Sequence, residues 1–372
     1  MRNKDGGEVK RSHPSPIGRR SHPSPYRGRK PPIPIHNPKS LNFDSMFRFL
    51  YHIIQLVLKA AFTLKKSAKE TTTIMIDLEQ KHQGKFDPSA IKKAARFQGV
   101  QQVFINDAFT QIVNRNTNPF EQRSNKLYFT LTGLYDDIID QKLIDEKTLN
   151  QLFEDPIHST TDIFETKALV DVHLNLIKRV KNIAAYKTTL ANVHQAQRDS
   201  SKQINSQLNQ EELIDITLRK GGYSLLMCRH YIDLPESKEI DNCFYQLGGV
   251  IQFTNDLFDI YKDLQECIQT IPNSAKNISE LKTIYDQLVH NFMNTIHHLP
   301  FEKSKLDSLK IKLSPIPAFG YLAIQNLAKL QDKEQQLPNL KSVPRKALII
   351  DMEKNINRFK LLQEAYKIYK TN

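Results

Sequence analysis

The chain has 372 residues, enough for one large domain or two ordinary ones, and with 39% hydrophobic residues it can build a sizeable core. It has no Trp and only 12 Gly, and its long stretches rich in Leu, Ile, Lys, Gln and Ala lack strand-like alternation. A β-rich protein is therefore excluded, and we expect an all-α protein. The net charge of +13 does not indicate a basic domain, because a surplus of seven positive charges lies in residues 1–45.

Three cysteines, Cys228, Cys243 and Cys267, stand far apart, and the chain has no CxxC pair. This usage fits a reducing compartment and argues against a zinc ribbon or a disulfide scaffold. We therefore expect a cytoplasmic protein.

Residues 1–45 form a basic tail that holds eight of the 18 prolines and repeats RSHPSP at 11–16 and 20–25. It shows no apolar period, so we predict disorder. It lacks the apolar core and cleavage site of a secretory signal. A start of translation at Met46 would explain the abrupt change of composition there. A tail of this kind could bind nucleic acid or anionic lipid, but no nucleic acid partner is expected.

The helical pattern begins with FRFLYHIIQLVLKAAF at 47–62, an apolar run that contains Arg48 and Lys59. The run is short for a membrane span, which needs about 20 residues. We predict a first helix packed on the core. Peripheral contact with a membrane through 47–62 is the alternative, and it would make the protein membrane-associated.

The remaining helices follow in close succession and form one α domain over 46–372. Asp87 is predicted as an N-cap with Pro88 at the first helical position, and the next helix starts near Pro119. Further helical segments are expected over 161–182, 184–207, 210–233, 237–270, 276–298, 303–312, 315–331 and 343–370. The connections are short and polar, which predicts roughly ten helices.

The segment LYDDIIDQ at 134–141 puts three aspartates into an apolar helix. Asp136 and Asp140 are four residues apart and share one face, and Asp137 lies at its edge. Like charges at this spacing destabilise a bare helix by a few tenths of a kcal/mol. Either this is a solvated helix turn, or a divalent cation bridges the carboxylates.

A second acidic cluster lies 119 residues further on, in QFTNDLFDIYKDLQE. Asn255, Asp259 and Asp263 stand at i, i+4 and i+8 and form a stripe on one helix face. Asp256 lies off this stripe, where we expect it to be solvated. Two acidic faces on apolar helices suggest two walls of one pocket. Mg²⁺ suits such a pocket, because it takes oxygen ligands from carboxylates and substrate phosphates.

Both clusters resemble the motifs of the class I isoprenoid (terpenoid) synthases. DDIID at 136–140 looks like the first aspartate-rich motif, and NDLFDIYKD at 255–263 looks like the second, usually written (N/D)DxxSxxxE. With Asp259 and Asp263 at the Ser and Glu positions, this helix is also similar to the DxxxD form of squalene and phytoene synthases. GLYDDIID, HQAQRDSSKQ and RKGGYSLL resemble bacterial terpene synthases. The resemblance covers most of 86–270.

The resemblance implies a single helical bundle of the isoprenoid synthase type around a central cavity. It also implies Mg²⁺-dependent ionisation of an allylic prenyl diphosphate, commonly with three ions, and Mn²⁺ as a substitute. Diphosphate is a poor leaving group until its charge is neutralised. The implied metal ligands are Asp136, Asp137 and Asp140 on one side and Asn255, Asp259 and Asp263 on the other.

Cationic side chains are expected to contact the diphosphate, and Arg198 and Lys220 are the main candidates. His194, Arg198 and Lys202 form an i, i+4, i+8 stripe. The catalytic set is predicted as Asp136, Asp137, Arg198 and Lys220. The other predicted substrate contacts are Lys202, Arg219, Lys262, Phe129 and Phe253. The resemblance also implies a helix break at Gly221–Gly222, and a plain loop there is the alternative.

Three reactions are open within this interpretation. The lone DDxxD motif favours cyclisation or elimination by a terpene synthase, and the second-motif helix favours head-to-head joining of two prenyl diphosphates. Chain elongation is the least favoured, because DDIIDQKLIDEK carries no Arg. The alternative of another class is a non-catalytic helical scaffold whose basic tail binds nucleic acid. A homodimer is compatible with the resemblance.

Overall fold

Several helices of this protein start at capping residues that the sequence shows. The computed structural model describes residues 43–141, 143–157 and 161–371. Asp87 caps the second helix by accepting a hydrogen bond from the Ser89 backbone N–H at 2.6 Å, and Pro88 occupies its first position as predicted. Asn118 and Asn209 cap two further helices in reciprocal capping boxes with glutamates three residues on. The start near Pro119 is thereby confirmed.

The described residues form α-helices and contain no β-strand, so the all-α prediction is confirmed. The prediction of roughly ten helices is too low, and the connection over residues 328–344 is long rather than short. The first eight helices are α1 (Phe43–His82), α2 (Pro88–Val100), α3 (Asp107–Ile112), α4 (Pro119–Asp140), α5 (Glu146–Glu154), α6 (Phe164–Ile177), α7 (Ile183–Ser200) and α8 (Gln210–Arg229). The others are α9 (Lys238–Phe258), α10 (Ile260–Gln265), α11 (Ile271–Ser274), α12 (Ile278–His297), α13 (Lys303–Leu313), α14 (Pro315–Leu327), α15 (Arg345–Leu348) and α16 (Asn355–Thr371). A π-helical turn over Gln101–Asn106 joins α2 to α3.

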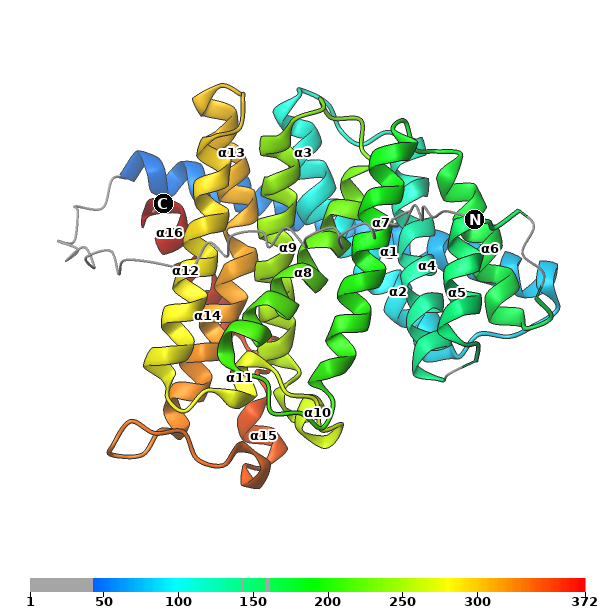
Figure 1. Cartoon of the computed structure of the whole chain (residues 1–372). Helices are drawn as coiled ribbons and strands as arrows, with labels where there is room; N and C mark the ends of the chain where they lie inside the picture. Colours follow the sequence, from blue (N-terminus) through cyan, green and yellow to red (C-terminus); the bar gives the residue numbers. More distant parts are fainter. Residues whose placement is uncertain (1–42, 142, 158–160, 372) are drawn as a thin grey trace, which may run out of the picture. The chain divides into compact units, whose positions relative to one another are not determined.

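Helix α9 is at the centre of the core. It packs against α8, α12 and α14, and these helices stand side by side with similar axes (Figure 1). Its inward residues Phe244, Leu247 and Phe253 are fully buried, and Phe253 meets the ring of Tyr285 on α12 at 5.1 Å. Burying such aromatic side chains contributes about 1.5–3 kcal/mol each. The core is therefore assembled around the helix that carries the second acidic cluster.

Helices α8 and α9 approach each other through glycines. A Cβ atom on Gly221 would lie 2.2 Å from the carbonyl oxygen of Gly248, and one on Gly222 would lie 2.5 Å from the Tyr245 ring. Helix α8 runs unbroken through both glycines. The predicted break at Gly221–Gly222 is therefore wrong, and so is the loop. The glycines are there because only residues without Cβ allow this backbone contact.

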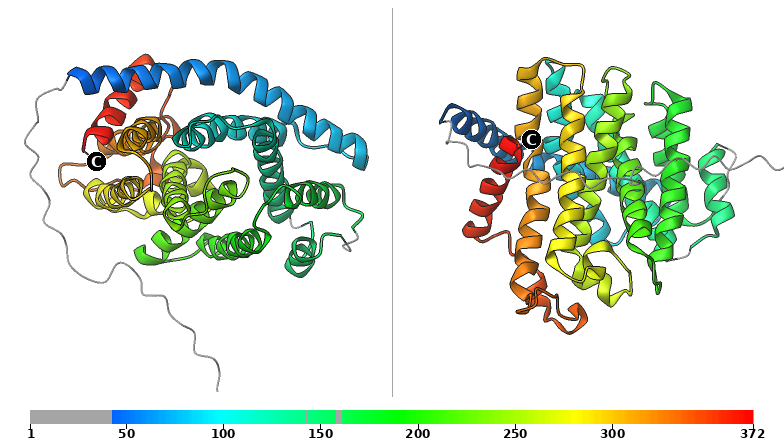
Figure 2. Two further views of the ribbon diagram at one scale, coloured as in Figure 1. Left: turned by 90° about the horizontal axis from the view of Figure 1, so that it is seen from above. Right: turned by 60° about the vertical axis from the view of Figure 1, so that its left-hand side comes forward.

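Helix α1 is far longer than the predicted run 47–62 and lies along the outside of the bundle, with the other helices on one side of it (Figure 2, left). Its inner face is buried through Phe49, Ile53 and Leu56, so the prediction that it packs on the core is confirmed. By length and composition alone, Asp44–His82 could also cross a membrane, with 22% of its most apolar window buried.

The chain divides into two units, Met1–Asn42 and Phe43–Asn372. The predicted tail falls almost entirely in the first, which lies outside the described residues. All three cysteines in the second are free, with Cys228 and Cys243 buried and Cys267 exposed.

Candidate functional site

The first acidic cluster occupies the C-terminal end of α4. Asp136 and Asp137 are partly exposed, and an Oδ of Asp136 lies 3.5 Å from the Lys93 ammonium on α2. The side chain of Asp140 lies outside the described residues. Two aspartates predicted as metal ligands are therefore accessible at a helix end.

Helix α7 lies against α4 directly beside this cluster. The hydroxyl of Tyr135, the residue before Asp136, is 2.8 Å from Nδ1 of His194, and Phe153 of α5 packs on the same imidazole at 4.3 Å. Burial, with a smaller contribution from the Arg198 charge, lowers the pKa of His194 to about 4, so this ring is neutral at pH 7. His194 is thus not one of the cations that the sequence stripe suggested.

Arg198 is the cation that α7 places near the first cluster. It follows His194 by one helix turn, is half-buried, and donates to the side chains of Gln195 at 2.7 Å and Asn150 at 3.5 Å. A guanidinium at this position can form bidentate hydrogen bonds with an oxyanion.

The second acidic cluster spans the junction of α9 and α10. Helix α9 ends at Phe258, and Asp259 sits between the two helices. The hydrogen-bonding period nevertheless continues: the Asp259 N–H donates to the Asn255 carbonyl at 2.8 Å, and the Asp263 N–H donates to the Asp259 carbonyl at 2.9 Å. The predicted i, i+4, i+8 spacing is therefore kept. Asn255 and Asp259 are exposed, whereas Asp263 is buried.

Asp256 is the residue that the sequence analysis misjudged. It is 7% exposed, not solvated, and it accepts hydrogen bonds from Gln252 Nε2 at 2.8 Å and from Thr217 Oγ1 at 3.4 Å. Burial raises its pKa to about 6, against the lowering effects of Gln252 and the Lys220 charge.

Asp263 adds a second buried carboxyl group to the same cluster. Its pKa is raised to about 7, mainly by burial and in addition by the negative charges of Asp256 and Asp259, while Lys262 opposes them. Lys262 is exposed and lies 3.7 Å from Glu266. The end of α9 and the start of α10 thus concentrate negative charge that nearby cations do not balance.

The remaining predicted cations are tied to other acidic groups. Lys202 and Arg219 both bind Asp199, at 2.6 and 2.7 Å, and Arg219 also binds Asp215 at 2.7 Å. These partners hold the pKa of the Asp199 carboxyl well below its usual range despite its partial burial. Lys220, in contrast, is half-buried on α8 within electrostatic reach of Asp256. Lys220 is therefore the predicted cation best placed at the second cluster.

A small cavity of about 40 Å³ lies against α4, directly before the first cluster. Tyr128 and Tyr135 contribute rings to it, and Phe153 closes it from α5. Its full lining is Tyr128, Leu131, Thr132, Tyr135, Phe153, Leu190, Val193, His194 and Met227. The predicted aromatic contacts lie elsewhere: Phe129 is half-buried beside Tyr128, and Phe253 belongs to the core. The volume suits a few water molecules, not a prenyl chain.

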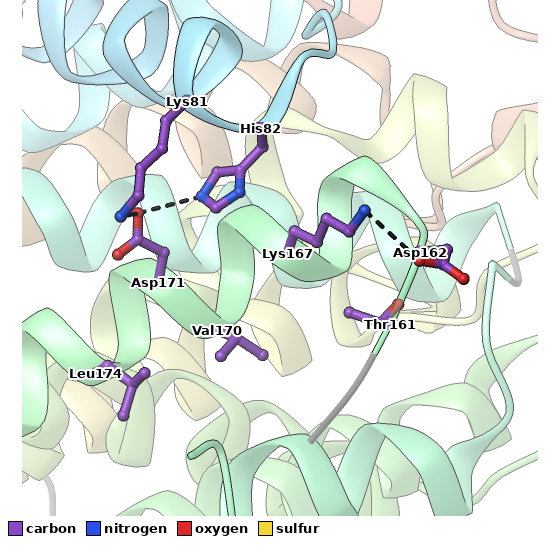
Figure 3. A pocket seen from close by; sticks show the side chains of 8 residues that line it. All are labelled: Lys81, His82, Thr161, Asp162, Lys167, Val170, Asp171 and Leu174. Carbon is purple, nitrogen blue, oxygen red and sulfur yellow. Dashed lines mark hydrogen bonds and ion pairs between the residues drawn. The ribbon is translucent and has the colours of Figure 1, made fainter. Parts of the chain in front are cut away.

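A larger and more open cavity of about 660 Å³ lies between the end of α1 and α6 (Figure 3). Its charges compensate one another: Lys81 and His82 contact Asp171 at 2.7 and 3.2 Å, and Lys167 lies 3.7 Å from Asp162. Neither acidic cluster reaches it, so it does not account for them.

The donor chemistry of the clusters fits a hard divalent cation. Among the described side chains, no three His, Cys, Asp or Glu are already grouped to hold a metal ion. Mg²⁺ does not need such a cage, because it is usually bound by one or two carboxylates together with water and substrate phosphates. Asp256, Asp259 and Asp263 carry carboxylates along α9 and α10, two of them buried, and Asn255 carries an amide oxygen, although these groups are not gathered around one point.

Compared with protein-family models, curated proteins and solved structures, the chain matches none of them.

Proposed function

We propose that this chain is a magnesium-dependent class I terpene synthase, built on an isoprenoid-synthase bundle, that ionises an allylic prenyl diphosphate. The observation that carries the proposal is the buried pair Asp256 and Asp263, whose pKa values are raised to about 6 and about 7. Burying carboxylates without matching cations costs stability. Cation binding at this site would explain why the two carboxyl groups are buried despite this cost. Ionisable side chains with strongly shifted pKa values are concentrated at functional sites.

The ligands would come from both clusters. Asn255, Asp259 and Asp263 would hold one ion together with the buried Asp256, and Asp136, Asp137 and Asp140 would hold others. Mg²⁺, when bound, would supply the positive charge that a diphosphate needs in order to leave.

Arg198 and Lys220 would bind the diphosphate oxygens and hold the substrate in register. Arg198 is half-buried on α7 and donates to Asn150 and Gln195, and Lys220 lies within electrostatic reach of Asp256 in the second cluster. As the allylic C–O bond breaks, its electron pair leaves on the diphosphate. Both cations then face increasing negative charge, which strengthens their interaction in the transition state.

The carbocation would form next to the aromatic lining before Asp136. Tyr128 and Tyr135 contribute aromatic rings, which attract positive charge, and the cavity of about 40 Å³ would have to widen to admit the prenyl chain. Neutral His194 suits this position, because a protonated imidazole would repel the cation. The cation is finally quenched by loss of a proton or by capture of water.

Head-to-head joining of two prenyl diphosphates is the second candidate. It is favoured by Asp259 and Asp263, which keep the DxxxD spacing through the hydrogen bond from the Asp263 N–H to the Asp259 carbonyl at 2.9 Å. The two reactions give different hydrocarbons, so product analysis separates them.

The test is diphosphate release by the full chain from geranyl, farnesyl, geranylgeranyl and longer prenyl diphosphates, with and without Mg²⁺. Asp136→Ala and Asn255→Ala are expected to lose release by at least about a hundredfold, because each removes a ligand for charge neutralisation. Asp77→Ala, an exposed carboxylate on α1, is the matched control. A hexane extract identifies cyclised or joined products.

Thermal unfolding with and without Mg²⁺ gives a readout that does not depend on turnover. We expect Mg²⁺ to raise the melting temperature, and Asp263→Asn to abolish the rise. Absence of both release and stabilisation would overturn the proposal. The non-catalytic scaffold would then be the better account, and salt-dependent binding of nucleic acid by the full chain would support it.

A further inference from the structure

The outer face of α1 exposes a continuous row of large apolar side chains, here called the apolar stripe. Its members are 38% to 79% exposed and are Phe47, Leu50, Tyr51, Ile54, Val57, Leu58 and Phe62. Their spacing of three and four residues puts them on one face of the helix over about four turns. Isolated exposed apolar residues are ordinary, but a contiguous row indicates an interaction surface.

The charged residues within this segment point away from the stripe. Arg48 binds Asp307 of α13 at 3.4 Å and the Ser304 carbonyl at 3.1 Å, and Lys59 binds Asp107 of α3 at 2.7 Å. Both therefore tie α1 to the rest of the bundle and leave its outer face uncharged.

The inner face of α1 remains packed in the same segment. Phe49 is 1% exposed and stacks on Tyr369 of α16 at 6.0 Å, and Ile53 and Ala60 are also buried. Crossing a membrane would strip the helix of these contacts. A helix that lies on the membrane surface would keep these contacts. The other helices occupy one side of α1, so its opposite side is open to such a surface (Figure 2, left). The geometry thus favours a helix that binds in the plane of an interface.

Positive charge flanks the stripe in space and in sequence. Lys65, Lys66 and Lys69 follow it on α1, all exposed, and Lys65 and Lys69 continue its face. On the other side, residues 1–45 carry a surplus of seven positive charges in the sequence. An apolar helix face flanked by lysines matches the headgroup and acyl boundary of an anionic bilayer.

We propose that the apolar stripe docks α1 onto an anionic membrane surface, with Lys65 and Lys69 on the phospholipid headgroups. A second copy of this chain fits the stripe less well. A symmetric dimer would pair the same patch of both subunits, and the stripe offers no acidic side chain to Lys65 and Lys69, whereas phospholipid headgroups supply negative charge. The proposal is independent of the enzymatic one, because no stripe residue belongs to the acidic clusters.

The absence of Trp makes the docking directly observable. In the full chain, Tyr51→Trp places a single fluorophore in the stripe, and Ile183→Trp places the matched control at the start of α7. With vesicles of phosphatidylcholine and phosphatidylserine, we expect the emission of Tyr51→Trp to shift to the blue and that of the control to stay. Salt and vesicles of phosphatidylcholine alone should each suppress the shift.

Co-sedimentation with the same vesicles tests the residues. The double variant Ile54→Gln with Leu58→Gln, and the double variant Lys65→Glu with Lys69→Glu, should each reduce the bound fraction at least tenfold, while Ile183→Gln keeps it. Because all four positions are exposed, circular dichroism should show unchanged folding. Unchanged sedimentation of either double variant would overturn the proposal. The proposal would also be overturned if the protein formed a concentration-dependent dimer and the double variant Ile54→Gln with Leu58→Gln abolished that dimer. A second copy of the chain would then cover the stripe.

Discussion

A methyl group on Gly221 would lie 2.2 Å from the carbonyl oxygen of Gly248, a distance that Cβ atoms do not tolerate. The obstacle is backbone, which cannot rotate away as a side chain does. The close approach of α8 and α9 therefore depends on glycine on both helices, and it sets the spacing between Lys220 and the second acidic cluster.

Gly221→Ala should lower the free energy of unfolding by about 1–3 kcal/mol, because the two helices must separate to accommodate the methyl group. Gly133→Ala on α4 is the matched control, since a Cβ there meets no atom within 4 Å. It should raise stability by about 0.5–1 kcal/mol through helix propensity alone. Urea unfolding followed by circular dichroism measures both. A stabilised Gly221→Ala protein would contradict the close contact.

Asp256→Asn should be most favourable for stability at alkaline pH. The pKa of Asp256 is raised from 3.8 to about 6 in the folded state, so the folded protein binds more protons there than the unfolded chain. Its contribution to stability is therefore lost as the pH rises from about 4 to about 6. Asparagine removes this loss, which amounts to about 3 kcal/mol at most. Melting temperatures of both proteins at pH 4 and pH 8 test this, and an equal difference at the two pH values would contradict it.

The contribution of His194 to stability changes with pH in the direction opposite to that of Asp256: it is lost as the pH falls. Its folded pKa of about 4 is below the ordinary 6.5, so the unfolded chain binds the proton more readily. Stability is therefore lost as the pH falls from about 6.5 to about 4. His194→Gln should flatten this loss by about 3 kcal/mol at most. Chemical denaturation at pH 7 and pH 4.5 compares this variant with the unchanged protein; equal losses in both would exclude the effect.

Phe153→Ala should enlarge the cavity beside the first acidic cluster. The Phe153 ring is buried and packs on His194 at 4.3 Å, so its removal costs about 3–5 kcal/mol and leaves space next to Tyr135. On the proposed function, turnover of longer prenyl diphosphates should rise relative to shorter ones. Phe109→Ala, equally buried but against Phe244, should cost similar stability without changing this ratio. The ratio of products from competing substrates measures the change.

Much of the fold could be predicted because helix boundaries have local causes. The starts at Pro88 and Pro119 follow from capping residues that precede them, and both are confirmed. The unbroken course of α8 could not be predicted the same way. Glycine is unfavourable in an isolated helix, and only the approach of Gly248 from another helix explains Gly221.

Some features of the candidate site also follow from nearby sequence, whereas others depend on packing between distant helices. The spacing of Asn255, Asp259 and Asp263 could be read from the sequence, and the backbone hydrogen bonds keep it. The burial of Asp256 could not, because it depends on Gln252 and on Thr217 of the neighbouring helix. Likewise, nothing local to His194 shows that Tyr135 and Phe153 would enclose it and hold it neutral.

The pKa of about 7 at Asp263 means that about half of the molecules carry a proton on this carboxyl group at neutral pH. A cation that binds there has to displace that proton, so cation uptake and proton release become one coupled equilibrium. Each fall of one pH unit below 7 would then weaken binding about tenfold. On the proposed function, the acidity of the surroundings would set, through this one buried side chain, the magnesium concentration needed to fill the site.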